Sequence, residues 1–363
     1  MHEATTQIQA VPLYAVHLSF TMQKMRDRTK VRRDPSILQS RILRILELAL
    51  LPRVTLALIM MYGWSCPSEA QIQIDPSGSL SDARRMLAAA DYAGADQVLR
   101  EILIHTPDSA DGHFLLGFAL LHERKPVESL TQYTLGAKFR DPGPEELIDV
   151  ASDYVLLKDY TDADRWLTAA AKRAPEKPSI WYLLGRTQYN ENYWSDAERS
   201  FLTCLRLDPH HVRAEYNLGL VYEMLQRPDD AIAAYRTAIA WQESSPVRDM
   251  QPYLDQGMLL RKQGKVREAL PLLTVAAQVG SRNPLVHQEL GLTFEQLSRY
   301  DEAIGELKVA ISLAPNVEAL HFFLGRLYRK TDHKEEAARE FAEAARIAGT
   351  QTDASVPNLE VPE

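Results

Sequence analysis

The sequence predicts an all-α fold, a solenoid of about eight stacked helical hairpins, because small residues recur along it with a fixed period. A first set of small residues recurs at a spacing of about 34 residues, widened once by four: Ala83, Gly117, Ala151, Gly185, Gly219, Gly257, Gly291 and Gly325. A second set lies twelve places further on: Ala95, Ser129, Ala163, Ala197, Ala231, Ala269, Ala303 and Ala337. Random spacing would almost never put Gly, Ala or Ser at all sixteen places. Such a period is typical of hairpins that stack only on their neighbours.

The fourth copy, residues 178–211, shows most clearly how one hairpin is built. A first apolar segment carries Trp181 and Gly185, a polar turn follows, and a second segment carries Ala197 and Phe201 before Pro209 ends it. Small residues at Gly185 and Ala197 let two antiparallel helices approach to the short end of the roughly 8–10 Å range of interaxial distances. The large apolar side chains then fill the space beside that contact, which predicts two helices in each copy.

This order of Trp, Leu-Gly, Ala, Phe and Pro resembles the tetratricopeptide repeat family, whose unit is about 34 residues long. The copy departs from the family pattern at the tyrosine place, which holds Gln188. The resemblance implies a right-handed α-solenoid with eight repeats, at 76–109, 110–143, 144–177, 178–211, 212–245, 250–283, 284–317 and 318–351. Four extra residues separate the fifth and sixth repeats, and there we expect the stacking either to loosen or to be re-aimed.

Residues 1–70 match no repeat and have the layout of a secretory signal. Basic residues precede the apolar run 54–62, and Ser68 and Ala70 are small residues of the kind that a signal peptidase reads before a cleavage site at Gln71. We therefore expect an exported protein, periplasmic or secreted. The alternatives are an uncleaved anchor facing the periplasm and an apolar helix with no targeting role. The stretch before the signal is longer than needed, so we expect translation to start at Met22 or Met25.

Two short segments flank the repeats, a linker at 71–75 and an acidic tail at 352–363. The tail has no apolar period and is expected to be disordered. Positions 1–70 carry nine Lys/Arg and five Asp/Glu, whereas positions 71–363 carry 32 and 44. An acidic body argues against nucleic acid as a partner, and contact with a membrane is expected only through an uncleaved N-terminal segment.

Nothing in the sequence points to an enzyme, a cofactor or a metal site. The chain has no HExxH motif, no Gly-rich phosphate loop and no paired cysteines at metal-ligand spacing. His113, His287 and His321 occupy one place in their repeats, so repeat geometry explains them better than metal ligation. Cys204 falls at a tightly packed place, which favours a buried thiol.

The resemblance implies that the first helix of each repeat lines an inner wall that binds a protein or peptide segment. At this wall the sequence places aromatic and aliphatic residues with a few arginines, a mixture that suits recognition. The candidate partner-binding residues are Phe114, Phe118, Tyr182, Arg186, Tyr189, Asn190, Arg213, Tyr216, Asn217, Leu220 and Glu223. The alternative is that these side chains are packing between adjacent helices.

The expected function is an exported scaffold that binds a segment of another protein in this groove. The alternative is a regulatory or substrate-delivery arm of a cell-envelope assembly or glycan-transfer enzyme system. The grip on chaperone C-termini that some members of the family have is not expected, because Tyr216 stands where a lysine would be needed.

Overall fold

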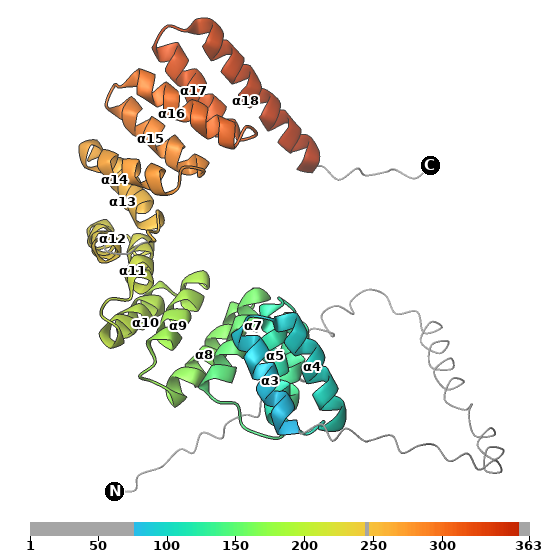
Figure 1. Ribbon diagram of the computed structural model, residues 1–363. Coiled ribbons are helices and arrows are strands. Elements are labelled where there is room, and N and C mark those ends of the chain that lie inside the picture. The colour runs from blue at the N-terminus through green and yellow to red at the C-terminus, as the bar shows by residue number, and fades with distance from the viewer. Residues whose placement is uncertain (1–75, 244–246, 356–363) are drawn as a thin grey trace, which may run out of the picture. The chain divides into compact units, whose positions relative to one another are not determined.

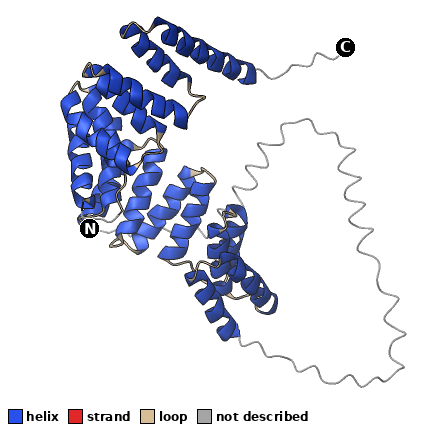
Figure 2. Ribbon diagram, turned by 45° about the horizontal axis from the view of Figure 1, so that its top comes forward, coloured by secondary structure: helices blue, strands red, loops and turns tan. Residues whose placement is uncertain are grey.

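A computed structural model describes residues 76–243 and 247–355, which form sixteen helices and no strand (Figure 1, Figure 2). The predicted signal region at 1–70, the linker at 71–75 and the cleavage site at Gln71 lie outside these residues. None of the described helices combines the length and the apolar character that crossing a membrane requires.

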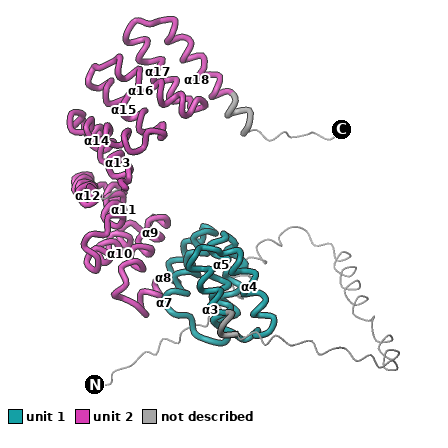
Figure 3. The backbone as a smooth tube through the Cα atoms, viewed as in Figure 1, with its two compact units in different colours: residues 1–166 teal, residues 167–363 magenta. Residues whose placement is uncertain are grey.

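The chain divides into two units, residues 1–166 and 167–363, and the boundary falls inside α8 (Tyr160–Arg173) (Figure 3). The other helices described in the first unit are α3 (Pro76–Ala88), α4 (Tyr92–His105), α5 (Ala110–His122), α6 (Pro126–Gly136) and α7 (Pro144–Leu156). The second unit continues with α9 (Pro178–Asn190), α10 (Trp194–Leu207), α11 (Val212–Met224), α12 (Pro228–Gln242), α13 (Gln251–Lys262), α14 (Val266–Val279), α15 (Pro284–Gln296), α16 (Tyr300–Leu313), α17 (Glu318–Lys330) and α18 (Lys334–Ser355).

Consecutive helices pair as hairpins within each unit, and each hairpin packs on the next one. The pairs α5 with α6, α9 with α10 and α15 with α16 are examples, and first helices also contact one another, as α9 does with α11. The prediction of an all-α solenoid of helical hairpins is confirmed, and each predicted repeat range holds two helices.

The two sets of small residues lie where the helices of a hairpin cross. A methyl group added at Gly185 would come within 2.8 Å of the Phe201 ring, and one added at Gly219 within 2.4 Å of the Tyr235 ring. Ala197 is fully buried on the facing helix. The structure therefore confirms that the small residues recur because the two helices of each hairpin approach closely at these places. Cys204 is also fully buried, and burial raises the pKa of its thiol to about 11.

Each hairpin turns on one residue in the left-handed conformation, with φ between 58° and 78°. These residues recur with the repeat period: Ala90, Arg124, Lys158, Asn192, Gln226, Gly264, Ser298 and Asp332. The N–H after each of them closes the first helix, as Asp159 N–H does by donating to the Tyr154 carbonyl at 2.9 Å. Only one of the eight is glycine, so residue type gave no indication of this turn.

The four extra residues between the fifth and sixth repeats do not interrupt the core. One apolar cluster runs from Tyr235 on α12 through Leu254 on α13 to Leu290 on α15. Buried Gln242 closes the connecting loop, since its amide donates to the Asp249 carbonyl at 3.0 Å and accepts from the Asp249 N–H at 2.9 Å. The stacking therefore does not loosen here, since the helices on both sides share one core, and a re-aimed stacking stays a prediction.

The last helix differs from expectation at its end. It continues to Ser355, so residues 352–355 are helical and do not belong to the disordered tail predicted at 352–363. The sequence has no proline between the start of the helix and Pro357, and nothing before that point stops it. Residues 356–363 lie outside the described part of the chain.

Candidate partner-binding surface

The first helices of the second unit, α9, α11, α13, α15 and α17, carry most of the residues predicted to bind a partner. We call the surface that they form the first-helix wall. Tyr182, Arg186, Tyr189 and Asn190 lie on α9, and Arg213, Tyr216, Asn217, Leu220 and Glu223 lie on α11. These two helices contact each other, so the structure brings the nine residues onto neighbouring repeats.

On α9 the two tyrosines are half-buried and two polar groups are exposed. The Tyr182 ring packs against Phe201, with centroids 6.2 Å apart, and against His211, at 4.8 Å. The Tyr189 ring meets Trp194 edge-on at 5.3 Å. Arg186 is exposed, with its guanidinium 5.6 Å from the centroid of the Tyr182 ring. In this repeat, Arg186 and Asn190 are therefore exposed to solvent, and both tyrosines are partly exposed.

On α11 most of the predicted residues already hold partners within the protein. The Tyr216 hydroxyl donates to the Asp255 carboxylate on α13 at 2.6 Å, which ties the fifth repeat to the sixth. Burial raises the pKa of Asp255 to about 6 and also raises the pKa of Tyr216. Glu223 accepts from the Tyr235 hydroxyl at 2.5 Å.

The remaining α11 residues divide between packing and exposure. Leu220 packs against the apolar cluster of α11 to α15. The Asn217 amide donates to the Arg213 carbonyl at 2.6 Å, while Arg213 itself is exposed. A role for these residues in recognition stays a prediction, with Arg213 the most accessible of them.

In the first unit, one of the two predicted phenylalanines belongs to the core. Phe114 is 5% exposed, stacks on Tyr133 at 6.0 Å and lies under the guanidinium of Arg140. The structure therefore corrects its assignment to the groove, because the neighbouring Gly136 leaves room for the ring to pack inward. Phe118 is half-buried and packs on His122, with ring centroids 4.2 Å apart.

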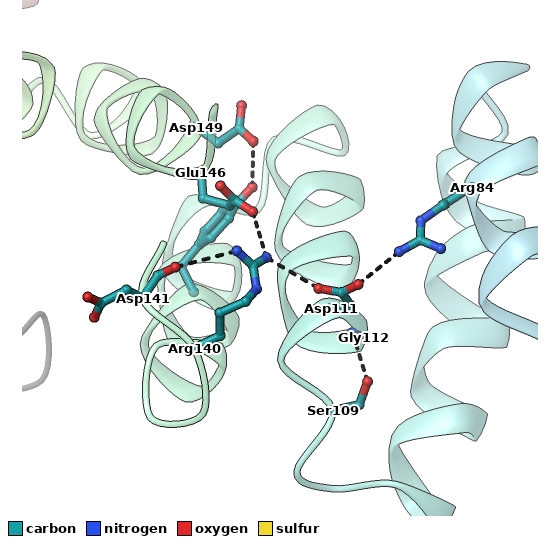
Figure 4. A network of polar contacts seen from close by, with 9 residues as sticks. Arg84, Ser109, Asp111, Gly112, Arg140, Asp141, Glu146 and Asp149 are labelled. Carbon is teal, nitrogen blue, oxygen red and sulfur yellow. Dashed lines mark hydrogen bonds and ion pairs between the residues drawn. The ribbon is translucent and has the colours of Figure 1, made fainter. Parts of the chain in front are cut away.

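Arg140 also organises a polar network in the first unit that the sequence did not indicate (Figure 4). Its guanidinium contacts Glu146 at 2.9 Å and Asp111 at 3.3 Å, and Asp111 accepts from Arg84 at 2.9 Å. The network links α3, α5 and α7 at their exposed surfaces, where ion pairs contribute little to stability. Arg140 lies in the connection after α6, outside the pattern of small and apolar residues.

Two carboxyl groups with raised pKa values follow on α7, one half-buried and one fully buried. Asp149 accepts from the Tyr133 hydroxyl at 2.9 Å, and burial raises its pKa to about 6. Asp153 is fully buried, lies 2.6 Å from the Ser129 hydroxyl, and has a pKa raised by burial to about 8. Such groups mark catalytic sites in some proteins. Here Asp153 faces a hydroxyl inside the helix packing, so the arrangement is structural.

The three histidines at one repeat place make equivalent contacts. One ring nitrogen of His113, His287 and His321 bonds, at 3.0 Å, the carbonyl six places upstream, and the other bonds a side chain nineteen places downstream. Trp181 donates to Pro175 in the same way at 2.7 Å. In the described residues, no group of three His, Cys, Asp or Glu side chains could hold a metal ion.

A cavity of about 710 Å³ opens on the first-helix wall further along, among α13, α15 and α17. Four cationic side chains line it: Arg261, Arg326, Arg329 and Lys330. The rest of its lining is Leu292, Glu295, Gln296 and Phe323. The sequence analysis missed this site because it named candidate residues only in the second, fourth and fifth repeats, although Arg261, Glu295 and Arg329 occupy the repeat place of Tyr189 and Glu223.

The charged groups of the cavity are held in two ways. Arg261 forms a buried ion pair with Glu289 at 2.8 Å, which fixes it in the wall. Glu295 instead contacts Arg326 at 2.5 Å through one oxygen and Lys330 at 3.7 Å through the other. The lining therefore sets four positive side chains against a single carboxylate, beside two apolar ones.

The sequence was compared with known families and proteins. The family model described as the tetratricopeptide repeat matches residues 188–246 and 254–318, which cover much of α9 to α16. The matched part of the chain is built from tetratricopeptide repeats.

Two curated proteins are similar to this chain in sequence. Anaphase-promoting complex subunit 3 of Schizosaccharomyces pombe is 23% identical over 75% of the chain and 41% of its own length. The peroxisomal targeting signal receptor of Komagataella phaffii is 28% identical over 47% of the chain and 30% of its own length. The chain thus spans less than half the length of either relative.

Solved tetratricopeptide repeat structures share the fold. The C-terminal part of a repeat-containing protein from Cytophaga hutchinsonii aligns over 68% of the chain and 99% of its own, with 14% identity and a TM-score of 0.55. The APC/C hetero-tetramer Cut9-Hcn1 aligns over 75% of the chain and 52% of its own, with 16% identity and a TM-score of 0.50. At these identities the likeness extends to the fold alone.

Proposed function

We propose that this chain is a non-enzymatic, exported scaffold whose second unit binds a segment of a partner protein on the first-helix wall. The observation that carries the proposal is the cavity among α13, α15 and α17, which combines apolar surface with charged groups on one face of the repeats. Pockets of this kind, with a few polar groups set in apolar walls, are where proteins take ligands. The named relatives support a binding role: one is a targeting signal receptor, the other a subunit of a complex.

The binding role is tested by selecting random displayed peptides on the full-length protein. Gln296 lines the cavity and is exposed, so Gln296→Trp should block it without disturbing the core. Val309→Trp is the matched control, because Val309 is 40% exposed on the second helix of the same repeat. We expect selected peptides to lose binding to the first variant and keep it to the second. Failure to select any peptide, or equal binding to both variants, would contradict the proposal.

Export rests on the sequence of residues 1–70 and is tested separately. We expect the mature protein isolated from its native host to begin at Gln71, as read by N-terminal sequencing. A membrane-bound product that starts at or before Met25 would instead support the uncleaved anchor.

A further inference from the structure

The cavity on the first-helix wall contains an acidic residue of its own where an anionic ligand would bind. Glu295 lies on α15 and places its two carboxylate oxygens against Arg326 and Lys330 of the next repeat. Its side chain is 13% exposed, whereas those of Arg326 and Lys330 are 38% and 48% exposed. The two cations thus reach solvent on one side and contact an internal carboxylate on the other.

Two of the cationic side chains of the cavity keep hydrogen-bonding capacity that no carboxylate of the described residues satisfies. The Nε atom of Arg326 is buried without a hydrogen-bond partner in the described part of the chain. Arg329 lies with its guanidinium 5.5 Å from the Phe341 ring centroid, and the described residues give it no ion pair. A buried guanidinium donor without an acceptor is costly, so an additional acceptor oxygen at Arg326 would be favourable.

We propose that Glu295 is an internal competitor that a carboxylate of the partner displaces. On this proposal, which rests on the proposed function, the cavity takes an Asp or Glu side chain next to an apolar one. The partner carboxylate would meet Arg326, Arg329 and Lys330, while Leu292 and Phe323 would contact the adjacent apolar side chain. Arg261 is held in its pair with Glu289 and shapes the wall without taking part in the exchange.

The charge balance favours an acidic segment over a basic or neutral one. With Arg261 neutralised by Glu289, three cations face one carboxylate, so a second carboxylate can enter without creating an excess of negative charge. Arginine binds carboxylates through two parallel N–H donors. A ligand carboxylate can use those of Arg326 only when Glu295 does not already occupy them. Glu295 should therefore weaken the binding of acidic ligands. A ligand that offers only one weak carboxylate contact should fail to displace it.

The proposal predicts opposite effects for two neighbouring substitutions. Glu295→Gln removes the competing charge and should tighten binding of an acidic peptide, whereas Arg326→Gln should weaken it by about tenfold, the size of one charge-assisted hydrogen bond. Arg326→Lys keeps the charge and should restore part of the loss. Matched controls are Glu302→Gln and Arg346→Gln, two exposed ion-paired residues on α16 and α18 away from the cavity.

The experiment measures fluorescence anisotropy of two short labelled peptides on the full-length protein. One contains Glu-Leu pairs separated by Gly-Ser, and the other carries Gln in place of every Glu. We expect the acidic peptide alone to bind, more tightly to Glu295→Gln than to wild type, and less at high salt. Melting curves of each variant show whether it is folded.

Three results would overturn the inference. These are equal binding of the two peptides, weaker binding to folded Glu295→Gln than to wild type, and no binding of the acidic peptide to any variant. None of them decides the proposed function, because random-peptide selection tests that independently. Selected peptides that are blocked by Gln296→Trp but contain no acidic residue would keep the function and refute the carboxylate exchange.

Discussion

The buried carboxyl group of Asp153 gives the sharpest prediction for stability. Its Oδ2 atom lies 2.6 Å from Ser129 Oγ, which in turn lies 2.8 Å from the Gly117 carbonyl oxygen. A hydroxyl group has one proton, and a carbonyl oxygen can only accept. If Ser129 donates to Gly117, the proton of the second bond must come from Asp153. A neutral Asp153 agrees with its burial and with the pKa of about 8.

This raised pKa makes the stability of the first unit depend on pH. The pKa of an unfolded Asp is about 3.9, so between about pH 4 and pH 8 the folded state holds a proton that the unfolded state has lost. The stabilisation is complete below the unfolded pKa and disappears as the pH rises through the folded pKa. Over that window the free energy of unfolding falls by about 1.4 kcal/mol for each pH unit. From pH 6 to pH 8 the loss is about 2–3 kcal/mol.

The Asp153→Asn variant tests this reasoning directly. Its amide has nearly the shape of the neutral acid and can donate to Ser129, but it does not titrate. Hydrogen exchange of peptides from α5 to α7 reports local opening, and comparing variant with wild type at each pH cancels the intrinsic exchange rate. Protection of the variant relative to wild type should rise about a hundredfold between pH 6 and pH 8. Asp301→Asn, at an exposed site on α16, should leave the ratio unchanged.

A ratio that stays constant over this range would refute the reasoning. It would mean that Asp153 is ionised in the folded protein throughout, or that its carboxyl group is open to water. A variant that is less protected than wild type at every pH would show instead that the ionised carboxylate contributes to the native structure.

Three further predictions concern the repeats. Gly185→Leu should lower the free energy of unfolding by about 1–3 kcal/mol in denaturant titrations, because the side chain collides with Phe201, whereas exposed Leu202→Ala should have little effect. Lys158→Gly should raise the melting temperature, since a non-Gly residue in the left-handed conformation costs about 1–2 kcal/mol, and Lys158→Ala should not. Tyr182→Ala and Tyr216→Ala separate recognition from packing. A recognition role requires loss of peptide binding by about 2 kcal/mol with melting almost unchanged, and a steep drop in melting contradicts it.

The fold could be predicted from the sequence because close helix crossings leave a local trace. Gly185 and Gly219 have no room for a side chain, so the need for small residues appears directly in the period. The hairpin turns leave no such trace, since Lys158 and Gln226 adopt the left-handed conformation although neither residue type prefers it. Helix capping by the backbone, not residue identity, sets that conformation.

The candidate site could be predicted only in part because exposure depends on packing between repeats. Tyr216 and Glu223 were assigned to the wall from their places in the repeat, but Asp255 and Tyr235 engage them from other helices. Glu295 was missed, since its importance comes from two cations one repeat away. Such relations become visible only when three consecutive helices are placed side by side.

The paired hydrogen bonds between Gln242 and Asp249 have a practical consequence for protein engineering. They fasten the connection between α12 and α13 at its base, while Tyr216 and Asp255 hold the adjoining hairpins in register. Because these bonds join Gln242 directly to Asp249, chain added between the two anchor points should apply no tension to the helices. A reporter domain or an affinity tag grafted there should leave both neighbouring repeats intact, whereas the same graft in a short hairpin turn would break a helix cap.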